Sequence, residues 1–364
     1  MPCPFPKNNS ENHHDIHHLR LITIGVSHFC EKARWALDLL QDQSLERASV
    51  ASSTKSYDQE RGDYYYYTED AHAPPFVSFF SVPASMDQAS QTPMVIFTDK
   101  HDNNDNNKNP RILVASTTIT RELCPFLYPE PYRSEIEQLE EDFGHRLGAT
   151  ARCVVYHQLL QPEYHDACRQ VCGAATTSSN VEAMLFNTLL DKGVAKAMRK
   201  MIVVNDNSSA ASLVTLRQVF AQVSDRLVAL DKNNKNNENN QTTRDTYLVG
   251  NQFTAADLTW AALAYPVLQP AETASLMGYI QDGQMPPALR ELRNELRVTR
   301  AGQHALQMYQ RHRLTQRGNE TAPRVVTLRS IGRNQWGGVR RFGTWAVGVG
   351  IVAMAARQAW DMWN

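Results

Sequence analysis

The stretch LRLITIGVSHFCEKARWALDLL, residues 19–40, decides the fold of the N-terminal half of the chain. Its first part, Leu19 to Val26, is rich in apolar and β-branched residues, which predicts a buried strand. The apolar residues that follow recur at helical spacing, at Phe29, Ala33, Ala36, Leu37 and Leu40. This spacing predicts an amphipathic helix directly after the strand, joined to it by a tight turn.

Two short apolar runs further along predict the rest of a sheet. They are MVIF, Met94 to Phe97, and RILVA, Arg111 to Ala115, and the polar loop between them suggests a hairpin. A helix from about Thr117 to Leu127 then closes the first domain. Long helical patterns follow over residues 132–160, 181–203, 209–230, 254–268 and 287–309. The predicted fold class is therefore an α/β domain followed by an all-α domain.

Composition divides the chain into four predicted regions. Residues 1–18 are expected to be a disordered N-terminus, and residues 19–128 an α/β domain with inserted loops. Residues 129–312 form the helical domain, and residues 313–364 a polar linker with an apolar tail.

Three stretches inside the two domains lack a regular pattern. Residues 102–110 and 231–243 are dominated by Asn and charged residues, too polar to repay the entropy of ordering, so we expect solvated loops. Residues 52–75 appear irregular and contain a tyrosine run. Tyrosines can stack on nucleic-acid bases, but no basic cluster accompanies these, so surface or partial core packing is expected.

Charge and cysteine usage limit the classes of partner and compartment. Lys and Arg number 37 against 38 Asp and Glu, for a formal net charge of -1, so no overall field attracts nucleic acid. The six cysteines occur in a chain without an apolar run near its start. We therefore expect reduced thiols and an intracellular, cytoplasmic protein.

The turn after the first strand carries the candidate chemistry. At a helix start, unpaired N–H groups and the helix dipole stabilise a thiolate or another anion. The string SHFCEKARWAL, beginning at Ser27, resembles the motif SPFxxKxRxAL of the glutathione transferases. That family combines a thioredoxin-like N-terminal domain with an all-helical C-terminal domain. The resemblance implies that Ser27 is catalytic and donates a hydrogen bond to the thiolate of glutathione; alternatively, Ser27 only caps the helix.

Two neighbours of Ser27 are interpreted from the same resemblance. Cys30 falls at the second Cys of the CxxC motif of redox relatives, and Ser27 replaces the first. Cys30 is therefore either a candidate thiol without a redox partner or an inert, half-buried residue. His28 stands where the family often has Pro, and we expect it to face solvent.

Two further segments are assigned to glutathione binding by the resemblance. Thr92, Pro93 and Met94 precede a short strand, where thioredoxin-like folds keep a cis-Pro whose preceding backbone aligns the peptide part of glutathione. Ser116 and Thr117 open a helix and are expected to hold the γ-glutamyl carboxylate, although a plain cap remains the alternative for Ser116. Ala115 replaces the usual acidic residue, so the γ-glutamyl ammonium lacks its usual partner.

The C-terminal half carries its own family resemblance. FTAADLTWAALAYPVL, residues 253–268, has Thr254 and Asp257 at capping-box spacing and resembles the box that starts a central buried helix in glutathione transferases. The expected function is a glutathione-dependent transfer, in which the glutathione thiolate attacks an electrophilic or hydrophobic small molecule. Similar proteins usually form homodimers. The alternative is a non-catalytic scaffold or membrane-associated binding protein, in the manner of the metaxins.

Two clusters of His and Cys residues are candidate metal sites. The tract HHDIHH ends at His18 and is expected to be a flexible terminal segment. Cys168 and Cys172, with His157 and His165 nearby, have no second CxxC motif, so no metal is expected. The segment containing them is expected to line the mouth of the cleft between the domains.

The chain ends in an apolar tail. FGTWAVGVGIVAMAA, residues 342–356, has arginines and tryptophans at its flanks. It is short for a membrane-spanning helix unless the arginines snorkel. Either it attaches the protein to an organelle membrane, or it docks on the protein's own surface or on a partner.

Overall fold

Strand β1 (Ile16–Ile24) is the second of four strands in a mixed sheet whose order is β2-β1-β3-β4. It pairs in parallel with β2 (Tyr64–His72) and antiparallel with β3 (Met94–Phe97), and β3 pairs antiparallel with β4 (Ile112–Val114). The predicted strand and the predicted hairpin are both confirmed. The computed structural model describes residues 16–53, 64–74, 92–97, 111–176, 180–236, 246–273 and 278–313, all within one compact unit, residues 1–327.

Both faces of β1 carry buried apolar side chains. Leu19 and Leu21 belong to the main core, whereas Ile22 packs with Met94 and Ile96 in a smaller cluster. Alternate residues of a strand point to opposite faces, so an uninterrupted apolar run is what a strand covered on both sides requires.

Strand β2 was not predicted, because residues 52–75 appeared irregular. Its tyrosines pair with the start of β1: His17 stacks on Tyr65 at 5.0 Å between ring centroids, and His18 on Tyr66 at 4.6 Å. Aromatic cross-strand pairs stabilise a sheet. The strand therefore begins before the apolar run, and the expectation that His17 and His18 belong to a flexible terminus is wrong; His13 and His14 lie outside the described residues.

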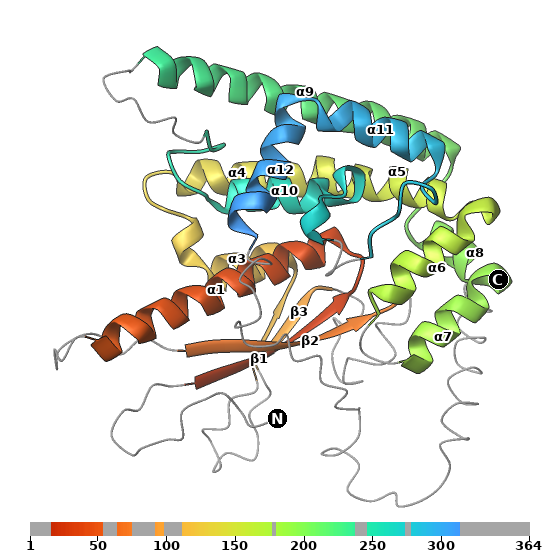
Figure 1. The fold of residues 1–364 in the computed structure, drawn as a ribbon, viewed down its shortest axis with the longest axis horizontal. Coiled ribbons are helices and arrows are strands. Elements are labelled where there is room, and N and C mark those ends of the chain that lie inside the picture. The colour runs from red at the N-terminus through yellow and green to blue at the C-terminus, as the bar shows by residue number, and fades with distance from the viewer. Residues whose placement is uncertain are drawn as a thin grey trace, which may run out of the picture. The chain divides into compact units, whose positions relative to one another are not determined.

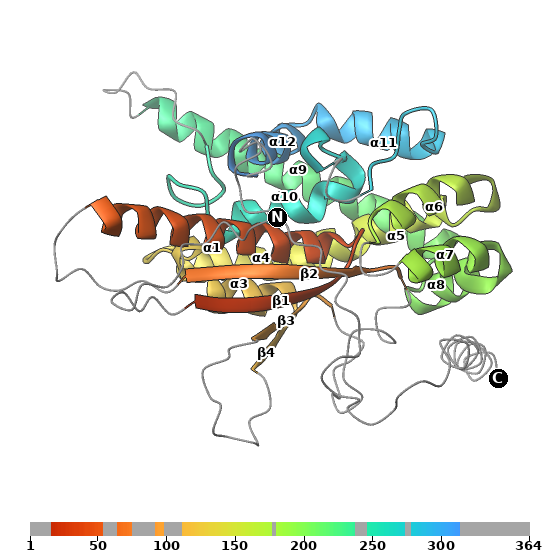
Figure 2. The same ribbon diagram turned by 60° about the horizontal axis from the view of Figure 1, so that its bottom comes forward.

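Helices α1 (His28–Ser53) and α3 (Ser116–Leu123) contact each other. Helix α1 also contacts β2 on one side and helix α10 of the helical half on the other. Figures 1 and 2 show α1 lying between the sheet and the helical half. The N-terminal helix thus joins both parts of the chain, and it is longer than the apolar pattern predicted.

The C-terminal half is helical, as predicted. Its helices are α4 (Arg133–Asp142), α5 (Ala149–Leu159), α6 (His165–Ala174), α7 (Asn180–Leu189), α8 (Ala195–Met201), α9 (Asp206–Asn236), α10 (Ala255–Leu268), α11 (Pro287–Arg297) and α12 (Arg300–His312). Wider π-helical turns join α4 to α5 and α7 to α8. Helix α6 was not predicted. Helix α9 continues to Asn236, so the Asn-rich loop begins later than Asp231.

Helix α10 is the centre of the helical half. Almost every side chain on it is buried, as expected for a helix that is apolar all round. Its Trp260 lies 5.2 Å from Phe143 and 4.9 Å from Phe220, measured between ring centroids. The predicted capping box is present at its start, where the Thr254 N–H donates to the Asp257 carboxylate at 3.1 Å.

The apolar tail, residues 342–356, lies outside the described residues. Among the helices of the described ranges, none is long and apolar enough to span a membrane. The predicted region boundaries at residues 128 and 312 stay predictions.

Candidate functional site

The strand registers bring the predicted site residues to one edge of the sheet. Met94 pairs with Ile22 near the end of β1 and with Val114 at the end of β4. The residue before Met94 is therefore next to the end of β4, and the Ala115 N–H donates to the Pro93 carbonyl at 3.0 Å. Ser27 follows the end of β1 by a short turn.

The turn that carries Ser27 is held by contacts of its neighbours. A Cβ atom on Gly25 would lie 2.0 Å from the Ala175 carbonyl oxygen, so only glycine fits this close approach. The Gly25 carbonyl accepts a hydrogen bond at 3.0 Å from Arg34, whose side chain is buried against Glu69. The Ser27 N–H donates to the Ile24 carbonyl at 2.9 Å. Ser27 itself is partly exposed.

Cys30 is completely buried on the first turn of α1. Burial raises the pKa of its thiol, although Arg34 and a hydrogen bond from Ser27 oppose the shift. Its sulfur also accepts from the Ile24 N–H at 3.4 Å. A neutral, enclosed thiol is a poor nucleophile, so the inert interpretation is favoured, with fuller burial than expected.

His28 does not face solvent, contrary to the prediction. It is 4% exposed, and its Nε2 lies 2.9 Å from the Gly148 carbonyl oxygen. Burial, together with the nearby Arg152, lowers its pKa to about 3. The ring is therefore neutral at neutral pH, with the proton on Nε2, because a carbonyl oxygen only accepts.

The peptide bond between Thr92 and Pro93 is cis, as the resemblance predicted. Thr92 is partly exposed, and no hydrogen bond to it occurs among the described residues. The Met94 side chain is fully buried in the cluster with Ile22, so Met94 offers a ligand only its backbone. Thr92 is therefore the residue of this segment that is open to a partner.

Helix α3 begins at Ser116 beside the cis-proline. Ser116 is 4% exposed, and no side-chain bond caps the helix. Ala115 before it has a φ of 72°, a conformation that residues with a Cβ adopt rarely. The Thr117 hydroxyl accepts from Lys32 Nζ at 3.1 Å. Thr117 can therefore offer a ligand its backbone N–H more readily than its side chain.

A buried ionic cluster that the sequence analysis missed fixes the start of α3. Lys32 Nζ lies 2.5 Å from Glu140 Oε1, and both side chains are 1% exposed or less. Arg121 and Tyr128 also donate to the Glu140 carboxylate, at 2.9 Å and 2.8 Å. Burial lowers the pKa of Lys32, and Glu140 opposes this shift. The cluster joins α1, α3 and α4.

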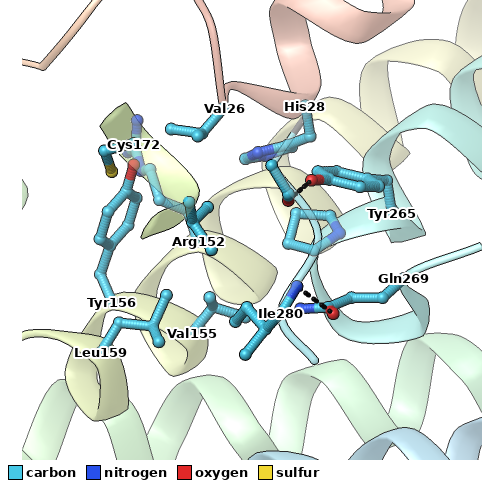
Figure 3. A pocket seen from close by; sticks show the side chains of 13 residues that line it. Val26, His28, Arg152, Val155, Tyr156, Leu159, Cys172, Tyr265, Gln269 and Ile280 are labelled. Carbon is cyan, nitrogen blue, oxygen red and sulfur yellow. Dashed lines mark hydrogen bonds between the residues drawn. The ribbon is translucent and has the colours of Figure 1, made fainter. Parts of the chain in front are cut away.

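A cavity of about 40 Å³ lies next to the Ser27 turn, on the side of the helical half. Val26 and His28 line it from the turn, Arg152 and Tyr156 from α5, and Tyr265 from α10. Figure 3 shows Tyr156 and Leu159 on one side of it and Tyr265 and Gln269 on the other.

The His and Cys residues weighed as metal ligands have other partners. His157 pairs with Asp206, His165 pairs with Asp191, and the free thiols of Cys168 and Cys172 are hydrogen-bonded to each other. In the described ranges, no group of three or more ligand side chains is placed to hold a metal ion.

No protein-family model matches the sequence, and no curated protein matches it either. Solved structures do. Ure2p in complex with glutathione is 12% identical, covering 79% of this chain and 93% of its own, with a TM-score of 0.40. Glutathione transferase F2 from Populus trichocarpa is 14% identical, covering 80% and 99%, with a TM-score of 0.36. The theta-class enzyme from Xanthomonas axonopodis pv. citri is 14% identical, covering 79% and 96%, with a TM-score of 0.34.

Because these TM-scores are low, the fold assignment rests on the chain's own architecture. The resemblance predicted the cis-proline before β3 and the buried, capped helix α10, and the structure adds the strand order and the parallel β1–β2 pair across α1. The chain thus has the two-part fold of the glutathione transferase superfamily, a thioredoxin-like domain followed by an all-helical domain.

Proposed function

We propose that the protein binds glutathione at the sheet edge formed by Ser27, Thr92 and Ser116, and joins glutathione through its sulfur to an electrophilic small molecule. The observation that carries the proposal is the contact between the cis-proline and the start of α3, the Ala115 N–H to Pro93 carbonyl bond. It sets Thr92, whose backbone has no hydrogen-bond partner among the described residues, beside a helix N-terminus.

Each part of this edge suits one part of the tripeptide. The first N–H groups of α3 have no partner within the helix and favour an anion such as the γ-glutamyl carboxylate. The backbone of Thr92 suits the peptide of the central cysteine. Ser27 follows the neighbouring strand and is partly exposed, so its hydroxyl can exchange its contact with Cys30 for a hydrogen bond to the glutathione sulfur.

The chemistry then belongs to the glutathione sulfur. A cysteine thiol has a pKa of about 8.5, and each unit of lowering corresponds to about 1.4 kcal/mol of preference for the thiolate. One charge-assisted hydrogen bond from Ser27 is of that size. The thiol proton passes to solvent, a carbon–sulfur bond forms, and the leaving group departs with its electron pair.

The proposal is tested with Ser27→Ala. We expect turnover of glutathione with 1-chloro-2,4-dinitrobenzene to fall at least tenfold at pH 6.5, with retention on immobilised glutathione preserved. The loss should shrink toward pH 9, where glutathione ionises without help. Ser134→Ala, at an exposed serine in the first turn of α4, is the matched control. Unchanged turnover in Ser27→Ala would remove Ser27 from the mechanism.

The alternative function is a non-catalytic scaffold, and Ala115 favours it. No carboxylate stands at that position to bind the γ-glutamyl ammonium. Retention on immobilised glutathione without turnover of any electrophile would support the scaffold. Activity that is lost in Cys30→Ser but kept in Ser27→Ala would instead indicate thiol exchange at Cys30.

We also propose that the tail attaches the protein to an organelle membrane. A reporter fused ahead of residues 340–364 should move to an organelle membrane in cells if the tail attaches there. A diffuse reporter would show that the tail has another role.

A further inference from the structure

The cavity beside the Ser27 turn has one positively charged group in its lining and no acidic one. Arg152 is the cation, and the other lining residues are apolar or neutral. Burial keeps His28 neutral by lowering its pKa to about 3, and burial also raises the pKa of Tyr156. The hydrogen bond with Cys168, together with burial, raises the pKa of Cys172. No negative charge in the lining therefore balances Arg152.

The other polar groups of the lining are satisfied by the protein. His28 bonds the Gly148 carbonyl, the Tyr265 hydroxyl donates to the Gly278 carbonyl at 2.9 Å, and the Gln269 side chain accepts from the Ile280 N–H. In contrast, neither the Arg152 guanidinium nor the Tyr156 hydroxyl has a hydrogen-bond partner among the described residues.

Arg152 and Tyr156 lie four residues apart on α5, so they occupy the same face of the helix. A guanidinium and a phenol are both hydrogen-bond donors, and a planar anion with two acceptor oxygens satisfies both at once. Arg152 is partly buried, so its attraction for such an anion is screened less than that of a fully exposed cation.

The cavity size limits the group that enters it. A volume of about 40 Å³ has room for two or three water-sized atoms, since one water needs roughly 10–15 Å³ on the same measure. A carboxylate has that size, whereas an aromatic ring does not fit. The body of a ligand must therefore stay outside the cavity, toward Val26 and the Ser27 turn.

We propose that Arg152 and Tyr156 bind the carboxylate of an otherwise apolar electrophile, and so select carboxylated second substrates. This inference rests on the proposed function, because it names the class of molecule that glutathione attacks. Arg152 and Tyr156 are specificity-determining residues in this scheme, and Ser27 keeps the role described above.

Binding is measured first, without glutathione and with ligands that cannot react. We use 3,5-dinitrobenzoate and 3,5-dinitrobenzamide, which differ in the charge of one small group, and measure dissociation constants by titration calorimetry. Wild-type protein should bind the benzoate at least tenfold more tightly than the amide. In Arg152→Met this ratio should fall to about one with amide affinity kept within twofold, and Tyr156→Phe should lower it in part.

The matched control is Arg146→Gln. Arg146 precedes α5 and pairs with Asp142 outside the cavity, so its loss should leave the ratio unchanged. Circular dichroism must show that every variant is folded. Equal affinities for the two ligands in the wild type, or a preference that survives in Arg152→Met, would overturn the inference.

Turnover separates this inference from the proposed function. With 4-chloro-3,5-dinitrobenzoate, sulfur replaces chloride on the ring, and chloride leaves with the bonding electrons. We expect kcat/KM to favour this substrate over its amide at least tenfold in the wild type and not in Arg152→Met. No turnover of either substrate, with the binding preference intact, would refute the transferase proposal and leave the carboxylate site standing.

Discussion

Replacing Asp257 by Ala should destabilise the helical half far more than the loss of an ordinary helix cap. The side chain is 0% exposed. Its carboxylate accepts hydrogen bonds from the Leu248 N–H at 2.8 Å, His304 Nε2 at 3.0 Å, the Thr254 N–H at 3.1 Å and the Thr254 hydroxyl at 3.0 Å. The group therefore joins the start of α10 to the preceding loop and to α12.

The size of the effect follows from the donors that Asp257→Ala leaves behind. A cap alone is worth about 1 to 2 kcal/mol, which is all that the sequence predicts. Each buried donor without a partner costs about 1 to 3 kcal/mol, and some recover by rotation or by admitting water. We expect a loss of about 3 to 5 kcal/mol in the free energy of unfolding, near the upper end of single substitutions.

The assay is urea denaturation of the full chain, followed by circular dichroism and by tryptophan fluorescence. Glu135→Ala is the matched control, because Glu135 has the same position in the first turn of α4 but is exposed and pairs with Arg226; it should cost less than about 1 kcal/mol. If Asp257→Ala costs no more than Glu135→Ala, the buried network does not stabilise the protein and the reasoning fails.

Two further predictions concern other buried ionisable side chains. The pKa of folded His28 is about 3, so below pH 6.5 the unfolded chain takes up a proton that the folded chain does not. The free energy of unfolding of the wild type should therefore fall relative to that of His28→Gln as pH falls from 6.5 toward 3, by up to about 1.4 kcal/mol per pH unit. Parallel curves of unfolding free energy against pH for the two proteins would contradict this. Arg313→Met should cost at least about 3 kcal/mol, because Arg313 is 1% exposed and lies 2.8 Å from the buried Glu31. The exposed Arg133→Ala, which breaks a surface pair with Glu130, is its control in the same denaturation assay, and equal effects would refute the role of burial.

The sequence predicts the elements whose periodicity is strong. The apolar run from Leu19 fits a strand covered on both faces, and the box at Thr254 correctly starts a buried helix. Strand β2 was missed because its sequence, YYYYTEDAH, lacks an apolar run and pairs through aromatic and polar contacts. Glu69, for example, accepts from Thr23 at 2.6 Å and from Arg34 at 2.5 Å. Long-range partners of this kind do not show in local periodicity.

The candidate site was predicted where it follows from a local motif. The cis bond at Pro93 and the position of Ser116 at a helix start were found. The burial of His28 was not, because its partner, the Gly148 carbonyl, is 120 residues away. Arg152 was also missed, because a single arginine on a helix forms no recognisable sequence motif. Its role is suggested only by the cavity that it lines and by the lack of an acidic residue in that lining.

Arg152 differs from three fully buried cations, each of which has a carboxylate partner. Lys32 pairs with Glu140, Arg34 with Glu69, and Arg313 with Glu31. The first pair joins α1 to α4, the second joins it to β2, and the third joins it to the residue after α12. The three pairs therefore hold α1, which begins beside Ser27, from three elements. The carboxylate partners offset the desolvation cost of these buried cations. Arg199 and Arg297 lack a carboxylate partner but donate to backbone carbonyls. Arg152 has neither kind of acceptor among the described residues, which fits its proposed role in binding an anionic ligand.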